Sequence, residues 1–582
     1  MTNHKNPAIF LASMKNLEVV KILNTIADIL ELQEVPFKPQ AYRRAALSIE
    51  SLSEDIREVY RRDELEEIPG VGKAIAEKIT ELLETGKLSY YEKLKKEIDL
   101  DIEELLSVPQ LGPRKIKVLY KKLGIKNIKN LEKALEKHKI RALSGFGEKT
   151  EQILWEGVQF IKTKPRRFLY FQVQPVVEEI RKRLSSLDIV AKVEVAGSFR
   201  RGKETVGDLD FLVVSSKPQQ VMNFFVSLPD VKEVLAKGTT KSSIRLSNGL
   251  QVDLRVVRAK EFGSAMNYFI GSKEHNVELR KFALSKGYTL SEYGLFTLKG
   301  KKWITGRTEQ EIYTKLGLQY IPPELRENTG ELTAALEGKL PKLIAVNDVK
   351  GVFHNHTVWS DGNNSLLEMA QKGEELGLKF ISFNDHFGPL GIVHPLTEKR
   401  LDSYVREIEK VQKKVGIKVF SGLEIDILKD GTLPLSRKKL QELDVVIASV
   451  HLSTKMAEPE MTKRVCQAFE NNTINILGHP TDRLLEERPE IALNWGKVFE
   501  SARNNKVFLE INGSPKRMDL EGLKVKAALE AGCKFSLATD AHDLAHLPFY
   551  ALALNMARRG WAETKDILNC WSLSKIEKAL QK

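Results

Sequence analysis

Three aspartates in the first half of the chain have the type and spacing that two-metal chemistry requires. Asp208 and Asp210 are one residue apart at the start of an apolar run, so on a strand both point to one face. Asp253 lies in a second, alternating apolar run, residues 250–257. Neighbouring carboxylates repel each other, and a divalent cation relieves that repulsion. On adjoining strands the three could hold two Mg²⁺ ions, one for an attacking hydroxyl and one for the leaving phosphates.

A glycine turn just before these aspartates is suited to a triphosphate. The segment 197–202 is Gly-Ser-Phe-Arg-Arg-Gly, and Ser198 and Arg201 are its candidate phosphate ligands. Two surface aspartates beside a hairpin are the alternative. The glycine turn, its arginines and Asp-x-Asp within one strand-turn-strand favour a nucleotide site instead.

Nine further residues could bind metal in the last 240 or so positions of the chain. Each lies at or just beyond the C-terminal end of a short β-rich run, and such ends converge on one face of a β/α barrel. A single histidine is more often a core or surface residue, but ligand types at successive strand ends indicate a metal pocket. Imidazole and carboxylate together suit zinc, manganese or iron. The nine residues are His354, His356, Asp361, His386, Glu424, His451, His479, Asp540 and His542.

A glycine-containing segment occurs three times in the first 160 residues, each time before a helical pattern. The copies are residues 68–72, 108–112 and 143–147. Each places a glycine turn at a helix N-terminus, where unpaired N–H groups and the helix dipole favour a phosphate. One copy could be an ordinary turn between packed helices, but three copies in a basic region favour a nucleic-acid backbone. The glycines expected at DNA are Gly70, Gly72, Gly112, Gly145 and Gly147.

The charge distribution agrees with a polyanionic partner. The net charge is +13, and residues 1–340 contribute 57 Lys and Arg against 46 Asp and Glu. Neutralisation of phosphates by such residues is the main source of nonspecific nucleic-acid affinity. Eight of the eleven histidines lie after residue 341, which indicates metal chemistry in the nearly neutral remainder.

Length and composition indicate several globular domains. A chain of 582 residues corresponds to roughly four domains at about 150 residues each. No apolar run approaches the roughly 18 residues of a membrane span, and the N-terminus lacks the core of a secretory signal. The three cysteines have no metal-ligand spacing and cannot all pair, as in a reducing compartment. We therefore expect a cytoplasmic monomer with no membrane partner.

The elements that must position these residues change twice along the chain. Residues 1–160 have the three- and four-residue apolar spacing of helices. Strands and helices alternate irregularly up to about residue 320. From residue 349 on, seven β-rich runs alternate with helical segments, which predicts a barrel-like α/β domain.

The motif 197–202, with Gly-Asp-Leu-Asp at 207–210, resembles the nucleotidyltransferase signature of family X DNA polymerases, which include DNA polymerase beta. The likeness continues at 268–272 and reaches back to 36–44 and 68–72. It implies that Asp208, Asp210 and Asp253 are catalytic metal ligands. It implies that the incoming triphosphate contacts Ser198, Arg201 and Gly207. It also implies a sugar pocket of Tyr268, Phe269 and Gly271, with Asn276 at the base and Arg280 at the template strand.

Beta-type enzymes also remove a 5′-deoxyribose phosphate through a lysine Schiff base. By resemblance Lys78 matches the nucleophile, and Lys38 and Lys87 match basic neighbours that bind the 5′-phosphate. Ala74 departs from the family at another basic position, although Lys73 adjoins it. A helix lysine near DNA is more often a phosphate contact than a nucleophile, so both roles of Lys78 stay open.

The ligand pattern of residues 345–582 resembles the PHP (polymerase and histidinol phosphatase) domain. Its His-x-His, its spaced acids and histidines and its final Asp-x-His all have counterparts here. The resemblance implies a trinuclear cluster of Mn²⁺ or Zn²⁺ held by all nine residues, and clustered metals hydrolyse phosphoesters. In bacterial and archaeal family X polymerases this domain is often a manganese-dependent 3′–5′ exonuclease, with phosphatase or abasic-site activity in some.

Together the resemblances imply a multidomain α+β and α/β fold. We expect a helix-hairpin-helix N-terminal region, a nucleotidyltransferase palm with a mixed sheet, and a distorted (β/α)7 barrel. The expected limits are a helical DNA-binding domain at 1–90, a fingers-like region at 91–165, the palm at 166–262, a thumb-like subdomain at 263–325, a linker at 326–344 and the PHP domain at 345–582.

The leading hypothesis is a repair polymerase that fills short gaps in DNA and carries an attached nuclease. It would bind gapped or primer-template DNA and deoxynucleoside triphosphates. One alternative is a DNA-binding scaffold with a single active catalytic site. Another is a PHP-type phosphatase for a small metabolite, which the repeats and the basic front section disfavour.

Overall fold

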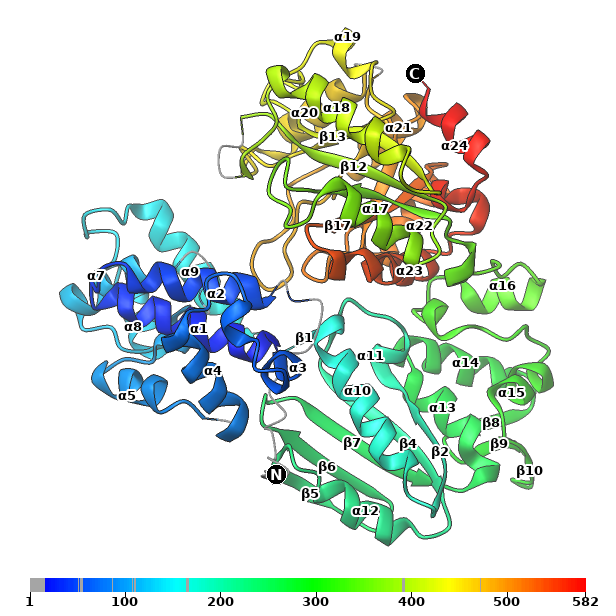
Figure 1. The fold of residues 1–582 in the computed structure, drawn as a ribbon. Helices are drawn as coiled ribbons and strands as arrows, with labels where there is room; N and C mark the ends of the chain where they lie inside the picture. Colours follow the sequence, from blue (N-terminus) through cyan, green and yellow to red (C-terminus); the bar gives the residue numbers. More distant parts are fainter. Residues whose placement is uncertain are drawn as a thin grey trace, which may run out of the picture. The chain divides into compact units, whose positions relative to one another are not determined.

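The computed structural model describes residues 16–581 except 51, 53–55, 86, 107, 109–110, 164–166, 390–392 and 471–472. Pro109 and Gln110 of the second glycine repeat therefore lie outside the described residues, as does the centre of the basic linker before the palm. The chain forms two compact units, residues 1–165 and residues 166–582 (Figure 1). No helix in the part of the chain that the structure describes is long and apolar enough to cross a membrane.

The first unit is helical, as the apolar spacing predicts. Two hydrophobic cores hold it together, one around residues 19–102 and one around residues 105–158. Helix ends follow local chemistry: Pro113 stands at the first turn of α7, and Gly124, with φ +65°, ends it. The helices are α1 (Asn16–Leu32), α2 (Lys38–Glu50), α3 (Ile56–Arg61), α4 (Lys73–Thr85), α5 (Ser89–Glu97), α6 (Ile102–Leu106), α7 (Pro113–Leu123), α8 (Ile128–Glu136) and α9 (Glu148–Thr163).

The second unit begins with a five-stranded mixed sheet in the order β2-β4-β7-β6-β5. Strands β4 and β7 are parallel and the other neighbours are antiparallel. Helices α10 and α12 contribute to a core with one face of this sheet. The mixed sheet of the palm is thus confirmed. Its elements are α10 (Tyr170–Ser185), β2 (Val190–Val195), α11 (Gly197–Arg200), β4 (Asp208–Ser215), α12 (Pro218–Val226), β5 (Val231–Lys237), β6 (Lys241–Leu246) and β7 (Gln251–Val257), with the short pair β1 (Phe168–Leu169) and β3 (Thr205–Val206) beside them.

A smaller α+β subdomain follows the palm. Helix α13 packs on the other face of the palm sheet, against Leu212 of β4. A second small core joins the remaining elements. These are α13 (Phe262–Ile270), α14 (Lys273–Ser285), β8 (Tyr288–Ser291), β9 (Gly294–Thr297), β10 (Trp303–Thr305), α15 (Glu309–Leu316), the short η3 (Pro323–Leu325) and α16 (Glu331–Glu337).

In the described part of the C-terminal region, seven parallel strands close into a barrel, which confirms the predicted barrel. The strands are β11 (Gly351–Asn355), β12 (Phe380–Phe387), β13 (Lys418–Asp426), β14 (Val445–Ser449), β15 (Ile476–Leu477), β16 (Phe508–Asn512) and β17 (Phe535–Ala541).

Helices surround this barrel (Figure 1). Helix α24 packs with Phe380, Val445 and Phe508, each the first residue of its strand, so it covers the N-terminal end. The C-terminal strand ends, where the predicted ligands lie, are at the opposite end. The helices are α17 (Leu366–Glu375), α18 (Glu398–Gln412), α19 (Arg437–Leu440), α20 (Glu458–Glu470), α21 (Trp495–Asn504), α22 (Gly522–Glu530), α23 (Tyr550–Arg559) and α24 (Leu573–Leu580).

Candidate active sites

The palm aspartates lie on two adjacent parallel strands. Asp208 and Asp210 are on β4, and Asp210 is directly opposite Asp253 of β7. Their neighbour Leu212 faces α13, whereas Leu209 packs in the core with α10 and α12. Because strand side chains alternate, the aspartates are on the α13 side of the sheet. Within the described residues, the groups of three or more candidate ligands whose ligand atoms all lie within 4.8 Å of one another are in the barrel. The ligand atoms of the three palm carboxylates are therefore spaced more widely.

The palm carboxylates destabilise one another's charge. Burial and the negative charges of Asp208 and Asp253 raise the pKa of Asp210 to about 7. Burial and Asp253 also raise the pKa of Asp208. A cation between such groups restores the ionised form, which is the form that binds a divalent metal. The charge state of the carboxylates therefore fits a metal site.

The glycine turn comes within contact distance of the aspartates. Gly197 has φ +65°, and a Cβ at this position would lie 2.7 Å from Oδ2 of Asp210. The amide of Ala196 donates to the Asp210 carbonyl oxygen at 2.8 Å. Only glycine fits both the backbone conformation and the close approach. Ser198, the next residue on α11, therefore lies near the carboxylate of Asp210.

Other residues predicted to bind the nucleotide lie directly after α11, on α13 and on α14. The buried Arg201 donates to the carbonyl oxygen of Ile270, at the end of α13. Tyr268 and Phe269 of α13 make an edge-on contact with ring centroids 5.0 Å apart. On α14, the Asn276 side chain donates to the Tyr268 carbonyl oxygen at 2.7 Å.

Two glycines and an arginine complete this set of candidates. A Cβ at Gly271 would lie 3.3 Å from Nη1 of Arg201. Gly207 directly precedes β4, and Arg280 donates through Nε to the Asn276 carbonyl oxygen at 3.2 Å. Of the eight predicted nucleotide-site residues, Ser198 and Arg201 thus belong to the glycine turn and Gly207 precedes β4, while the other five lie on α13, directly after it or on α14.

The glycines of the N-terminal repeats differ in their backbone conformations. Gly70 and Gly145 have φ of +80° and +84°, so a side chain there is strained. Gly72, Gly112 and Gly147 have no atom within 4 Å of an added Cβ, and they directly precede α4, α7 and the helix that contains Glu148. Gly70 and Gly145 thus determine the shape of the turns, whereas Gly72, Gly112 and Gly147 leave space for a phosphate at helix N-termini.

The lysines of the first unit are dispersed along its helices. Lys38 begins α2, and Lys87 lies between α4 and α5. On α4, Nζ of the half-buried Lys78 donates to the Ala74 carbonyl oxygen at 2.8 Å and lies 5.0 Å from the Tyr90 ring centre. This surface position suits a phosphate contact.

In the barrel, Glu424 of β13 stands at the centre of the predicted ligands. Its carboxylate oxygens lie 2.9 Å from His386 Nδ1, 2.9 Å from His479 Nε2 and 3.2 Å from His354 Nε2. Two more histidine nitrogens, of His356 and His451, are within 3.6 Å. Residues at or just after the ends of five different strands, β11 to β15, therefore meet in one pocket.

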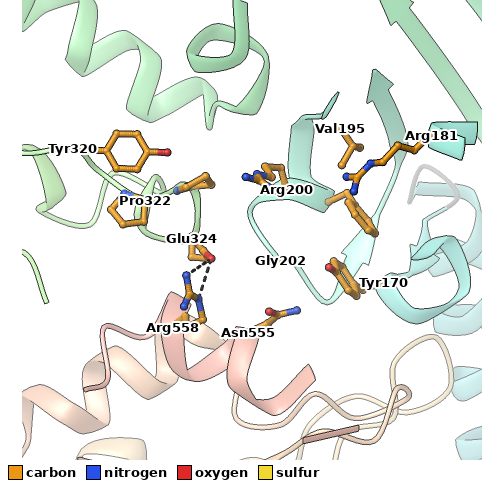
Figure 2. A pocket seen from close by; sticks show the side chains of 12 residues that line it. Tyr170, Arg181, Val195, Arg200, Gly202, Tyr320, Pro322, Glu324, Asn555 and Arg558 are labelled. Carbon is orange, nitrogen blue, oxygen red and sulfur yellow. Dashed lines mark hydrogen bonds and ion pairs between the residues drawn. The ribbon is translucent and has the colours of Figure 1, made fainter. Parts of the chain in front are cut away.

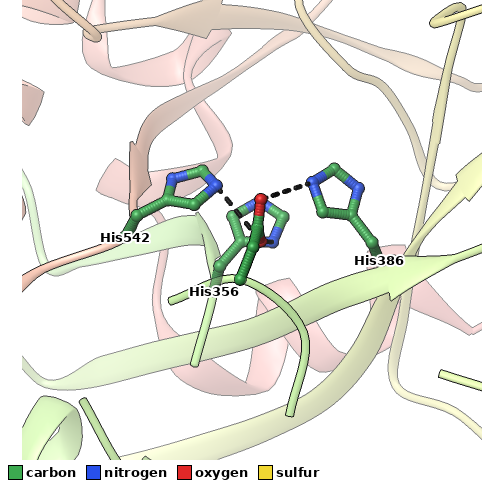
Figure 3. A group of neighbouring side chains, drawn as sticks. His356, His386 and His542 are labelled. Atoms are coloured by element: carbon green, nitrogen blue, oxygen red, sulfur yellow. Dashed lines mark ion pairs between the residues drawn. The ribbon is translucent and has the colours of Figure 1, made fainter. Parts of the chain in front are cut away.

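A second group adjoins this one and shares His356 and His386 with it. Asp361 lies 3.4 Å from His542 Nε2, 3.7 Å from His386 Nε2 and 3.8 Å from His356 Nδ1. Figure 3 shows the imidazoles of His356, His386 and His542 around this carboxylate. Asp540 approaches His356 Nε2 to 3.5 Å. The structure thus brings all nine predicted ligands together in overlapping groups.

The chemistry of this pocket fits metal ions. Both ring nitrogens of His356 and Nδ1 of His479 are buried and have no hydrogen-bond partner among the described residues. Such nitrogens carry a desolvation cost that metal coordination removes. Burial would raise the pKa of Glu424, but the surrounding histidines outweigh it and hold the pKa well below the usual range. An ionised carboxylate among imidazoles is a donor set for divalent transition metals.

Two supporting carboxylates were missed in the sequence. Glu510 of β16 lies 2.6 Å from Nδ1 of His354 and accepts the His479 amide at 2.9 Å. Asp426 of β13 lies 2.7 Å from Nδ1 of His451. Each leaves the other imidazole nitrogen facing Glu424, which is how carboxylates orient histidine ligands. The sequence feature that could have indicated Glu510 and Asp426 is an acidic residue within an otherwise apolar strand.

We expect Glu510→Gln to weaken metal binding by about 10–100-fold, the usual effect of losing such a partner. The amide keeps the size of the side chain but removes the charge that orients His354. Glu500→Gln, at an exposed position of α21, is the matched control. Metal content after dialysis measures the effect, and equal retention in both variants would show that Glu510 does not support the site.

Comparisons with known proteins agree with this geometry. Family models match as a helix-hairpin-helix domain (14–88), a SAM-like helix-hairpin-helix tandem (102–156), the DNA polymerase beta palm (171–255), the DNA polymerase beta thumb (265–327) and the PHP domain (353–514). The DNA polymerase/3′-5′ exonuclease PolX of Bacillus subtilis is 35% identical over 573 residues, 98% of this chain and 100% of that protein. The chain belongs to the PolX family.

Two other relatives match separate parts of this family X polymerase with a PHP domain. DNA polymerase lambda of Rattus norvegicus is 24% identical over 344 residues, 54% of this chain and 57% of that protein. A probable phosphatase of Thermoanaerobacter sp. is 28% identical over 242 residues, 39% of this chain and 93% of that protein. Both resemblances stated from the sequence motifs are thus confirmed.

Proposed function

We propose that this PolX-family protein fills short gaps during DNA repair and degrades DNA from the 3′ end in its barrel domain. The observation that carries the proposal is the full-length match to PolX, in a chain that retains both acidic and histidine-rich sites. Divalent metals serve both activities. Against the scaffold alternative, a candidate ligand stands at every expected position.

For the polymerase reaction, Asp208, Asp210 and Asp253 would hold two Mg²⁺ ions, which would supply positive charge for the primer hydroxyl and the leaving pyrophosphate. Ser198, Arg201 and Gly207 bind the triphosphate. We infer that Asp253, which lies opposite Asp210, accepts the proton of the primer hydroxyl. Tyr268, Phe269 and Gly271 enclose the sugar, and Asn276 and Arg280 contact the base and the template.

In the barrel, the nine ligands would hold a cluster of Mn²⁺ or Zn²⁺, which would supply an activated water for phosphodiester hydrolysis. The protein's own part is to orient the ligands through Glu510 and Asp426 and to exclude bulk water. His354, His356 and Glu424 are buried, so these three ligands are shielded from bulk water.

The first unit binds the DNA backbone, in a cytoplasmic protein that acts as a monomer. Residues 1–90 and 91–165 contribute the glycine turns, residues 166–262 and 263–325 the palm and thumb, and residues 345–582 the hydrolytic domain after the linker 326–344. Lys38 and Lys87 contact phosphate, and Lys78 does so or forms a Schiff base with a 5′-deoxyribose phosphate. Borohydride trapping on a 5′-deoxyribose phosphate end decides between these roles.

The test of this function compares two hydrolysis substrates and one synthesis substrate. The proposal expects extension on gapped DNA and 3′-end degradation of DNA, with much slower hydrolysis of a mononucleotide. Fast hydrolysis of the mononucleotide without activity on DNA would instead support the small-molecule phosphatase. Extension without any hydrolysis would support a protein with one active site.

We expect Gly72→Ala to weaken binding of gapped DNA by severalfold at low salt and to leave hydrolysis of a small phosphate ester unchanged. An added methyl group meets no protein atom there, so it interferes only with a phosphate approaching the N-terminus of α4. Ala74→Gly, which removes a methyl group from the first turn of α4, is the matched control. Equal affinity of Gly72→Ala and wild type across a salt titration would show that this turn is structural only.

A further inference from the structure

Helix α23 of the barrel packs against the palm and the end of the thumb. Figure 2 shows Asn555 and Arg558 of α23 near Gly202, which ends the glycine turn, and near Glu324. A Cβ at Gly202 would lie 3.4 Å from Cβ of Asn555. Arg558 donates to Glu324 through Nε at 2.9 Å and Nη2 at 2.7 Å. The hydrolytic domain thus contacts the turn that precedes the polymerase aspartates.

The neighbouring Arg559 bonds the turn itself. Its Nη1 donates to the carbonyl oxygen of Arg201 at 2.9 Å and to Oε1 of Glu327 at 3.0 Å. The same Glu327 oxygen accepts from Nε of Arg201 at 2.9 Å. One carboxylate therefore bridges a palm guanidinium and a barrel guanidinium.

These three side chains are shielded from water, with exposed fractions of 6% for Arg559, 11% for Arg201 and 15% for Glu327. Burial would raise the pKa of Glu327, but the charges of Arg559, Arg201 and Lys203 outweigh it and lower the pKa. Glu327 is therefore ionised at neutral pH. Charge-assisted hydrogen bonds in such surroundings are strong and directional.

We propose that Arg559, in the hydrolytic domain, is a positioning residue for nucleotide addition: it fixes Arg201 for the incoming triphosphate. The inference rests on the proposed role of Arg201 in triphosphate binding. It makes the barrel a structural part of the polymerase site.

The first reason is geometric. The helix α11 has only four residues, too few to hold its own conformation. Arg559 bonds the carbonyl oxygen at its C-terminal end, while Ile270 and Glu327 bond the Arg201 side chain. Without Arg559, the carbonyl oxygen of Arg201 loses the hydrogen bond from Nη1 of Arg559. The backbone of the turn then becomes more mobile.

The second reason is electrostatic. Arg201, Arg559 and Lys203, whose Nζ lies 3.5 Å from Oε2 of Glu327, share one carboxylate, so this group carries a net charge of +2. If Arg559 were absent, the net charge would fall to +1, and the attraction for a triphosphate would fall with it. Both effects weaken nucleotide binding and leave the aspartates in place.

Arg558 provides a matched control on the same helix. It too is paired with a carboxylate at the end of the thumb, Glu324, and among the described residues its other hydrogen bond goes to the Ile344 carbonyl oxygen at 2.6 Å. It therefore shares the interface and the charge of Arg559 without bonding Arg201 or Glu327 in the described structure.

The experiment measures single-nucleotide insertion on gapped DNA by the full chain carrying Arg559→Ala, Arg559→Lys or Arg558→Ala. We expect Arg559→Ala to raise KM for the nucleotide about tenfold or more, the effect of losing a charged hydrogen bond, with a smaller change in kcat. Arg559→Lys, which reaches one partner rather than two, should lie between Arg559→Ala and wild type. Arg558→Ala should keep the wild-type KM, and manganese-dependent 3′-end degradation should persist in all three.

Arg201→Ala separates the possible failures. If it leaves KM for the nucleotide unchanged, the proposed triphosphate site is wrong. If Arg201→Ala raises KM and Arg559→Ala does not, the positioning role of Arg559 is overturned while the proposed function stands. An equal rise in KM in Arg558→Ala also overturns it, since general loosening of the interface then explains the effect. If Arg559→Ala does not fold, the KM of Arg559→Lys for the nucleotide tests the proposal instead. A wild-type KM in Arg559→Lys would then refute the positioning role of Arg559.

Discussion

The Asp253→Ala variant is expected to lose nucleotide addition by roughly a thousandfold or more while it still binds gapped DNA. Asp253 lies opposite Asp210, and the change removes both a metal ligand and the proposed proton acceptor, whose role alone contributes about 10²–10⁴-fold. DNA affinity depends on phosphate contacts elsewhere and should stay almost intact. Single-turnover insertion with Mg²⁺ and DNA-binding anisotropy measure the two properties.

Asp188→Ala is the matched control, since Asp188 is an exposed aspartate of the palm. It should extend a primer at the wild-type rate. Manganese-dependent degradation should persist in both variants because the barrel ligands are untouched. Wild-type extension by Asp253→Ala would contradict the assignment of the palm site.

The His356→Ala variant is expected to lose 3′-end degradation by about a hundredfold or more and to retain primer extension. The ring of His356 approaches Asp361, Glu424 and Asp540 within 3.8 Å, so it belongs to both parts of the pocket. Loss of a direct ligand should cost at least as much as the 10–100-fold typical of an outer partner. Degradation of a labelled strand in Mn²⁺, with metal analysis of the same sample, measures the effect.

His394→Ala is the control, because His394 is an exposed histidine of the same domain and contributes to none of the candidate metal groups among the described residues. It should keep wild-type degradation and metal content. Survival of the nuclease in both His356→Ala and His451→Ala would show that the barrel is not its source.

Local periodicity was enough to predict the positions of the barrel ligands. Each ligand follows an apolar run, and the rule that strand ends converge then places His354, Glu424 and Asp540 together. The partners Glu510 and Asp426 could not be predicted in the same way. Which imidazole nitrogen they face depends on how the barrel closes, and the sequence shows only that an acid interrupts an apolar strand.

The palm shows the same division between local and long-range information. Alternation along β4 predicts that Asp208 and Asp210 share a face. The parallel pairing that sets Asp210 opposite Asp253 joins strands separated in sequence by β5 and β6, and no local pattern specifies that register. The bond between Arg559 and Arg201 spans 358 positions and was likewise invisible in the sequence.

The glycine repeats show a further limit. Gly70 and Gly72 look equivalent in the sequence, yet only Gly70 has a positive φ. Which glycine shapes the turn and which leaves space for a phosphate depends on backbone angles, because glycine permits both signs of φ.

The central claim is that one chain carries two separate active sites for the same DNA end. One labelled primer on gapped DNA tests it most directly, incubated with Mg²⁺ and nucleotides or with Mn²⁺ alone, for wild type, Asp253→Ala and His356→Ala. The account predicts that wild type extends and shortens the primer, that Asp253→Ala only shortens it, and that His356→Ala only extends it. Loss of both activities in either variant, or persistence of both, would contradict the claim.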